Sequence, residues 1–178
     1  MRCRTAPLPG GDQPTAAGSV AGVVRTPKPF TARQERFGRW FTKRMARFNI
    51  WVYHKSNGRF GARVGAAPIC LLTTTGRRSG VARTVPLLYL EQLNDDRIVV
   101  VASQGGMSTN PEWYLNLVAE PKVTVEIGGD ARAMVARDAS TEERAQLWPL
   151  LVAMYPGYDT YRQRTTREIP IVICTPGV

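Results

Sequence analysis

A turn rich in arginine and hydroxyl side chains is the first place where residue types and spacing indicate chemistry. The run TTTGRRSG at residues 73–80, followed by Arg83, brings hydroxyl groups and three guanidinium groups within eleven residues. Backbone N–H groups in a glycine-bearing turn form anion-binding nests, and guanidinium groups bind phosphate or carboxylate through several hydrogen bonds. The turn lacks the Lys-Ser/Thr ending of a P-loop. A hairpin tip with its arginines in water is the alternative interpretation.

A second cluster follows an apolar run. The segment ASQGG at residues 102–106 has a serine and two glycines that would present backbone donors to a ring or a phosphate. Trp113 and Asn116 lie three residues apart and share one face of an expected helix. The alternative is that Trp113 belongs to the core and that Asn116 is a helix cap or a solvated residue.

Three tyrosines form the third cluster. Tyr155, Tyr158 and Tyr161 are spaced by three, which predicts a row of phenols along one helical face. Aromatic rings with polar tips suit the wall of a pocket for a flat substrate. Ordinary amphipathic packing of a helix is the alternative.

Cysteine and histidine usage excludes several classes of site. Cys3, Cys70 and Cys174 lie far apart in no metal-binding spacing, and His54 is the single histidine. A disulfide scaffold, a structural zinc site and a His-based metal cluster are therefore excluded. Cys70 and Cys174 stand in apolar runs, which predicts that both are buried. No stretch approaches the roughly 20 apolar residues that a membrane-spanning helix needs, and we expect no signal peptide.

The net charge of +10 is concentrated near the start of the chain. Residues 1–63 hold 13 basic and 2 acidic side chains, whereas residues 64–178 hold 11 basic and 12 acidic ones. Residues 1–30 lack an apolar period and are predicted to be a flexible leader, so that one domain spans residues 31–178. Apolar residues recur at steps of three and four over residues 31–54, with arginines between them, which predicts an amphipathic cationic helix. Such a segment can bind a nucleic acid or an anionic membrane surface, or it can have no binding partner.

The remaining sequence alternates short strands with turns. Strands are predicted over residues 68–75, 83–92, 97–104, 123–127, 131–137 and 169–174. Helices are predicted from Pro111 after an Asn110 cap, from the capping box of Ser140 and Glu143 to about Tyr155, and over residues 157–165. No βαβ alternation and no GxGxxG motif is present, which disfavours a Rossmann domain. The expected fold is mainly β with α (α+β), a small barrel of about six antiparallel strands with short helices outside.

Several motifs in order resemble the deazaflavin-dependent nitroreductase family. They are LLTTTGRRSG, VPLLYL, ASQGG, NPEWYLNL, PKVTVEI, ARDASTEERAQLWPLLVAMYPGYDTY and IPIVIC, and the resemblance covers about residues 35–176. It implies a split β-barrel that binds coenzyme F420, a deazaflavin with a phosphate and a polyglutamate tail. It also implies hydride transfer from the reduced form, F420H2, to a quinone or to a nitroaromatic acceptor such as a nitroimidazole.

The resemblance also implies roles for individual residues. Ser103 would lie near the reacting group of the substrate, and Tyr155, Tyr158 and Tyr161 would cover the substrate. A lysine is common in the family where Gln104 stands, and some members have a tyrosine in place of Leu88, so quinone reduction is expected more strongly than nitroimidazole activation. The implied cofactor-binding residues are Thr75, Gly76, Arg77, Arg78, Ser79, Gly80, Arg83, Pro86, Ala102, Ser103, Gln104, Gly105, Gly106, Trp113 and Asn116.

An F420H2-dependent quinone reductase is therefore the first functional hypothesis. A barrel that holds a deazaflavin, FMN, haem or a lipid without turnover is the second. Nucleic-acid binding through the basic N-terminal third is the third, and it lacks a recognition motif, so no specific nucleic acid is expected. Because lipid quinones lie in membranes, residues 31–54 would bind an anionic membrane surface, which predicts a cytoplasmic protein at the inner face of the cell membrane. Docking of this segment on the barrel, at a homodimer contact, is the alternative.

Overall fold

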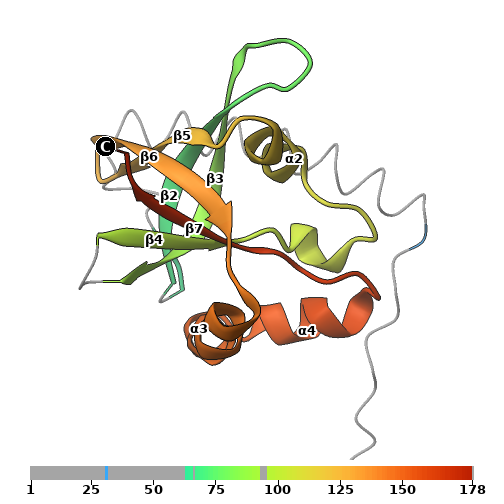
Figure 1. Cartoon of the computed structure of the whole chain (residues 1–178). Helices are drawn as coiled ribbons and strands as arrows, with labels where there is room; N and C mark the ends of the chain where they lie inside the picture. The colour runs from blue at the N-terminus through green and yellow to red at the C-terminus, as the bar shows by residue number, and fades with distance from the viewer. Residues whose placement is uncertain (1–30, 32–62, 66, 93–95, 178) are drawn as a thin grey trace, which may run out of the picture.

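A closed antiparallel barrel forms the body of the protein (Figure 1). The computed structural model describes residue 31 and residues 63–65, 67–92 and 96–177. The predicted leader at residues 1–30 and nearly all of the predicted basic helix at residues 31–54 lie outside these described residues.

Six strands close the barrel, and one short strand pairs beside them. The barrel strands are β2 (Ala67–Thr75), β3 (Ala82–Gln92), β4 (Arg97–Val101), β5 (Lys122–Ile127), β6 (Asp130–Asp138) and β7 (Ile171–Pro176). Their order is β2-β3-β4-β7-β6-β5, and pairing of β5 with β2 completes the circle. The short strand β1 (Arg63–Val64) pairs with the start of β2. The prediction of a mainly β fold with about six antiparallel strands is confirmed.

Strand β7 contributes to two apolar cores, one inside the barrel and one between the barrel and the helices. Val172 and Cys174 point into the barrel, whereas Ile171 and Ile173 belong to a second cluster between the barrel and the helices. A strand buried on both faces needs a continuous apolar run rather than an alternating one. That requirement explains the sequence IVIC, and the predicted burial of Cys70 and Cys174 is confirmed.

Three helices of the described residues pack around the barrel. Helix α2 (Glu112–Ala119) places Trp113 and Leu117 in the inner core. Helices α3 (Thr141–Met154) and α4 (Gly157–Arg164) place Leu151 and Tyr158 in the outer cluster and lie together below the barrel in Figure 1. The Trp148 ring of α3 lies 5.4 Å from the guanidinium carbons of both Arg144 and Arg162, which joins the two helices through cation–π contacts.

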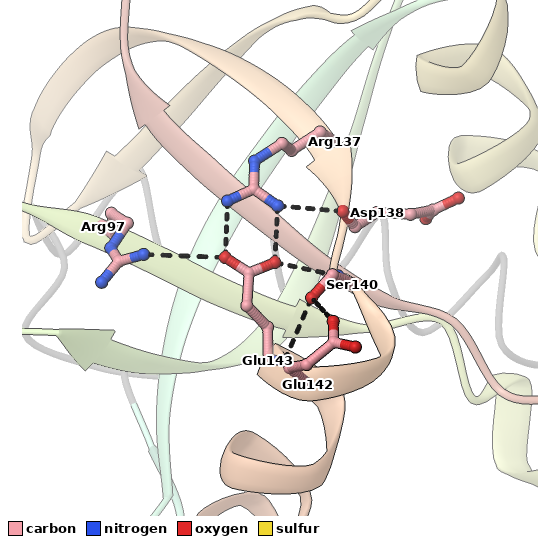
Figure 2. A network of polar contacts seen from close by, with 6 residues as sticks. All are labelled: Arg97, Arg137, Asp138, Ser140, Glu142 and Glu143. Atoms are coloured by element: carbon pink, nitrogen blue, oxygen red, sulfur yellow. Dashed lines mark hydrogen bonds and ion pairs between the residues drawn. The ribbon is translucent and has the colours of Figure 1, made fainter.

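The start of α3 is fastened to the barrel by one carboxylate (Figure 2). Glu143 accepts a hydrogen bond from the Ser140 backbone at 2.8 Å, and the Ser140 hydroxyl accepts one from the Glu143 backbone at 3.2 Å, so the predicted capping box is confirmed. Both terminal nitrogens of Arg137 on β6 also donate to Glu143 at 2.7 Å, and Arg97 on β4 lies 3.9 Å away. The hydrogen bonds from Arg137 hold the pKa of Glu143 down to about 2.

Several predicted boundaries are wrong, and β7 runs from Ile171 to Pro176 rather than over residues 169–174. The strand β4 ends at Val101 rather than at residue 104, because Gln104 takes a positive φ of 46° and residues 104–106 form a 3-10 turn, η1 (Gln104–Gly106). Helix α2 begins one residue later than predicted, with Pro111 in the cap position and no side-chain cap. Asn110 is not the cap, because its side-chain oxygen accepts a hydrogen bond from Arg167 at 2.8 Å.

Candidate functional site

The arginine-rich turn between β2 and β3 is held by its own backbone. The N–H of Gly76 donates to the carbonyl of Val81 at 2.9 Å, and the Gly76 carbonyl accepts from Ser79 at 3.0 Å and Gly80 at 2.7 Å. Gly80 takes a φ of +66°, which favours glycine. A β-carbon on Gly76 would lie 2.9 Å from both the Ser79 hydroxyl and the Val81 carbonyl oxygen. The two glycines are therefore required by the tight turn itself.

One of the three arginines of this turn forms hydrogen bonds with helix α2. The Arg77 guanidinium donates to the Glu112 carboxylate at 2.6 Å, and its backbone N–H donates to the side-chain oxygen of Asn116 at 3.2 Å. The amide of Asn116 in turn donates to the Thr74 hydroxyl at 3.2 Å. Asn116 is buried, so it is neither solvated nor a side-chain cap, and it ties the turn to the helix.

The other two arginines of the turn are turned to solvent. Arg78 and Arg83 are exposed, and among the residues that the structure describes neither guanidinium has an acidic partner. Two unpaired cations beside exposed Thr75 and Ser79 hydroxyls are suited to an anionic ligand. Pro86 lies further along β3, opposite Leu71 of β2, and is half-buried.

The segment after β4 forms a tight turn with one open side. Ser103 is buried, and Gln104 and Gly105 both have positive φ values, of 46° and 67°. A β-carbon on Gly105 would meet nothing within 4 Å, so its outer face is open. A β-carbon on Gly106 would lie 2.7 Å from the carbonyl oxygen of Tyr161, so the inner face of the turn packs on the α4 backbone.

Arg167, which the sequence did not single out, holds this segment from behind. Its guanidinium donates to the carbonyls of Ala102 at 3.1 Å, Ser103 at 2.9 Å and Met107 at 2.9 Å, and to the Asn110 side chain at 2.8 Å. Burial lowers the pKa of Arg167, yet an arginine stays protonated at physiological pH. No local pattern marks Arg167, because its partners are 57 to 65 residues away in the sequence.

The three tyrosines gather as predicted, but not along one helix. Tyr155 caps the end of α3, Pro156 precedes α4, and only Tyr158 and Tyr161 lie on α4. The Tyr155 ring folds back over Gly157, where a β-carbon would collide with it. The prediction of a single row along a helical face is therefore wrong, because the chain breaks between the two helices.

The resulting tyrosine cluster has one buried ring and a pair of hydrogen-bonded phenols. The ring centres of Tyr155 and Tyr158 are 5.2 Å apart, and the hydroxyls of Tyr155 and Tyr161 are 3.0 Å apart. Burial, followed by the hydrogen bond between the Tyr161 and Tyr155 hydroxyls, raises the pKa of Tyr161 to about 12, and burial likewise raises the pKa of Tyr158. These two phenols are thus neutral near pH 7. Leu88 of β3 packs against the same outer cluster.

These elements form a continuous chain of contacts around one side of the barrel. The turn at residues 76–81 contacts α2, the segment at residues 102–110 leads into α2, and η1 packs on α4 beside the tyrosines. Figure 1 shows α2, the 3-10 turn and α4 along the same side of the barrel. Trp113 belongs to the inner core, so the core interpretation of this residue is confirmed.

The residues on this side fit a deazaflavin. The side-chain oxygen of Gln104 is buried and has no hydrogen-bond partner among the described residues, so it can accept a hydrogen bond from a heterocyclic N–H. The open face of Gly105 leaves room for a flat ring, and Arg78 and Arg83 suit an anionic tail. Two hollows elsewhere, one lined by Arg97 and Glu143 and the other by Asp96 and Arg132, do not include these residues.

The described residues place two limits on other chemistry. No group of three or more His, Cys, Asp or Glu side chains among them is arranged to hold a metal ion. None of their helices has the length and apolar character that crossing a bilayer requires.

The fold is that of a split β-barrel protein, with short helices packed around six antiparallel strands. The chain belongs to the F420H(2)-dependent quinone reductase family, whose model matches residues 45–176. It is 34% identical over 145 residues to an F420H(2)-dependent quinone reductase of Mycobacterium tuberculosis, covering 77% of this chain and 96% of the relative.

Two solved structures are also similar to this chain. One is an F420-H2 dependent reductase (FDR-A), with 42% identity and a TM-score of 0.55, covering 60% of this chain and 93% of that one. The other is described as a domain-swapped dimer, with 37% identity and a TM-score of 0.58, covering 72% of this chain and 95% of that one. The resemblance, the split-barrel fold and the F420 dependence expected from the motifs agree with these findings.

Proposed function

We propose that this protein is an oxidoreductase that transfers a hydride from F420H2 to a quinone. The observation that carries the proposal is the chain of contacts that joins the exposed cations Arg78 and Arg83, the open turn at Gly105 and the tyrosine cluster. Family membership supports the same activity. When bound, reduced F420 supplies the hydride, so that the protein needs no strong acid or base of its own.

The residues of the site would bind and orient the two reactants. Arg78 and Arg83 would hold the anionic tail, and Gln104 would accept a hydrogen bond from the ring system. Tyr155 and Tyr161 would cover the acceptor, because their hydroxyls form a hydrogen-bonded pair at 3.0 Å that can face a substrate oxygen. Holding two reactants in a productive orientation is itself a large part of catalysis.

Proton delivery to the reduced quinone is the remaining chemical need. A quinone that accepts a hydride needs one further proton to become a hydroquinone. Solvent would supply this proton, either directly or relayed through the Ser103 hydroxyl or the Tyr155 and Tyr161 pair, and each relaying hydroxyl would regain a proton from water as it gives one up. The raised pKa of Tyr161 keeps its hydroxyl protonated between turnovers.

Anaerobic oxidation of F420H2 by menadione tests this proposal. We expect the purified chain to accelerate the return of the F420 absorbance, and to bind F420 in preference to FMN and FAD when all three are titrated under one set of conditions. Binding of F420 without any acceleration would instead identify a barrel that holds its ligand without turnover.

Nitroaromatic compounds are a second class of acceptor to be tested at the same site. Leu88 packs in the outer cluster beside the tyrosines, where it would shape the acceptor side of the site. We expect slower reduction of a nitroimidazole than of menadione, and a Leu88→Tyr variant assayed with both acceptors tests whether this position sets the ratio. An unchanged ratio would remove Leu88 from the specificity argument.

The location of the protein is proposed from sequence alone. A cytoplasmic protein at the inner face of the membrane would meet lipid quinones, and the cationic pattern of residues 31–54 suits an anionic surface. Co-sedimentation with anionic liposomes should fall when residues 31–54 are deleted, and equal binding by both forms would contradict this location. A homodimer is a further proposal, prompted by the similar structure described as a domain-swapped dimer, and ultracentrifugation tests it.

A further inference from the structure

The guanidinium of Arg167 joins the backbone on both sides of the 3-10 turn. Two of its nitrogens reach the carbonyls of Ala102, Ser103 and Met107, and the third reaches the Asn110 side chain and the Glu168 carbonyl at 3.2 Å. An arginine offers five N–H donors in a planar fork, and all three of its nitrogens are engaged here. The side chain thus fixes the segment at residues 102–110 as one unit.

The contacts of Arg167 also decide where the peptide N–H groups of this segment point. In a trans peptide the carbonyl and the N–H point in opposite directions. Because the carbonyls of Ala102 and Ser103 point at Arg167, the N–H groups of Ser103 and Gln104 point away from it. The structure gives neither N–H an acceptor among the residues that it describes.

The charge on Arg167 strengthens these donors. A cation at a peptide carbonyl draws electron density toward the oxygen and makes the N–H of the same peptide a better donor, since hydrogen bonds in a chain polarise one another. Arg167 is half-buried, so its charge is screened less than it would be at the surface.

We propose that Arg167 is a positioning residue that turns the Ser103 and Gln104 N–H groups toward the bound deazaflavin and keeps them there. The inference rests on the proposed function, since the ligand that receives these donors is F420. Arg167 itself lies on the opposite side of the peptides and acts through them. The ligand atoms that suit such donors are the carbonyl oxygens of a flat heterocycle.

Binding of F420 to substituted proteins tests the role of Arg167. The variants are Arg167→Lys, which keeps the charge but loses the fork, and Arg167→Met, which loses both. We expect the dissociation constant of F420, measured by fluorescence titration well below the melting temperature, to rise at least tenfold in Arg167→Met and less in Arg167→Lys. The KM for menadione, measured at saturating F420H2, should stay within about twofold of the wild-type value.

Arg144→Met is the matched control. Arg144 also donates to a backbone carbonyl, that of Ile169 at 2.6 Å, and pairs with Glu168 at 3.4 Å, but it makes no contact with residues 102–110 in these interactions. We expect its melting temperature to fall without a change in the F420 dissociation constant. An unchanged constant in folded Arg167→Met, or an equal rise in both variants, would overturn the proposal.

Amide exchange supplies a measurement that needs no ligand. Peptides covering residues 102–110 should exchange faster with deuterated water in Arg167→Met than in Arg144→Met, and equal exchange would also overturn the proposal. If Arg167→Met fails to fold, Asn110→Ala replaces it, because that variant removes one partner of Arg167 and leaves its carbonyl contacts. If the wild-type protein binds no F420, the proposed function falls, while the exchange comparison still decides whether Arg167 holds the segment.

Discussion

The carbonyl oxygen of Tyr161 lies 2.7 Å from the position that a β-carbon on Gly106 would take. Gly106 also has a φ of +81°, so its lack of a side chain is required twice, by conformation and by contact. This contact sets the distance between the 3-10 turn after β4 and helix α4, which carries two tyrosines of the cluster.

Gly106→Ala should therefore destabilise the protein more than Gly105→Ala. Both residues have positive φ, which costs about 1–2 kcal/mol for alanine, but a β-carbon on Gly105 would meet nothing within 4 Å. Gly106→Ala adds a collision with backbone and should also raise the KM for menadione, since α4 must move. Urea unfolding of both variants checks the order, and equal losses of stability would show that α4 yields without cost.

Arg78→Ala should weaken F420 binding more than Arg77→Ala. Arg78 is exposed, whereas the Arg77 guanidinium already binds Glu112 at 2.6 Å. A charge-assisted hydrogen bond contributes about 1.5–3 kcal/mol, so we expect the dissociation constant to rise about tenfold to a hundredfold, and to rise more for long glutamate tails than for a tail-less deazaflavin. Arg132→Ala, on the distant β5–β6 hairpin, is the control. An unchanged constant for Arg78→Ala would remove the anion site from this turn.

Glu112→Gln should strengthen binding of the anionic tail. The Glu112 side chain is 69% exposed, so its pair with Arg77 adds only about 0–1 kcal/mol to stability and the melting temperature should change little. Removing the carboxylate raises the positive charge of the turn and releases Arg77 toward the ligand. Titration with F420 at two salt concentrations measures the effect, and weaker binding at low salt would contradict it.

Asn116→Leu should lower the free energy of unfolding by about 1–3 kcal/mol, because it leaves the Arg77 backbone N–H and the Thr74 hydroxyl without their partner. Val118→Ala, on the exposed side of the same helix, is the control, since Val118 is 61% exposed. Denaturant unfolding compares the two. Equal stability of Asn116→Leu and the wild type would show that water replaces the lost contacts.

Acid should remove the contribution of Glu143 to stability. Its pKa is about 2 in the folded protein and near the ordinary carboxylate value of about 4.3 in the unfolded chain. A lowered folded pKa means that the contribution is complete above about pH 4.3 and is lost as the pH falls toward 2. Glu143→Gln should flatten the melting temperature over this range. Glu142→Gln is the matched comparison, because backbone and Ser140 hydrogen bonds lower the pKa of Glu142 as well, but Glu142 does not contact Arg137, so a larger effect of Glu143→Gln reports the Arg137 contacts. An identical acid dependence in the wild type and in Glu143→Gln would assign the acid sensitivity to other groups.

Local signals in the sequence were enough to predict much of the fold. The β5–β6 hairpin turns at Gly128 and Gly129, whose φ values are +60° and +91°, and the capping box joins two residues only three apart. In both cases the interacting groups are neighbours in the chain, so residue type and spacing determine the structure.

The parts that sequence analysis missed depend on distant or unusual geometry. Gln104 takes a left-handed conformation that residue type does not predict, which shortened β4. Tyr155 lies outside α4, and its ring joins the others only because Gly157 gives it room. The contacts of Arg167 and of Glu112 could not be predicted from the sequence. They join segments that are far apart along the chain, and residue spacing does not show which segments meet in space.

The position of β7 has a consequence for biosynthesis. It lies between β4 and β6, pairing Ile98 with Cys174 on one side and Val135 with Thr175 on the other. Until residue 176 leaves the ribosome, those two neighbours have unsatisfied edges, and unpaired strand edges invite association with other chains. We therefore expect the nascent chain to depend on chaperones until β7 is inserted between β4 and β6.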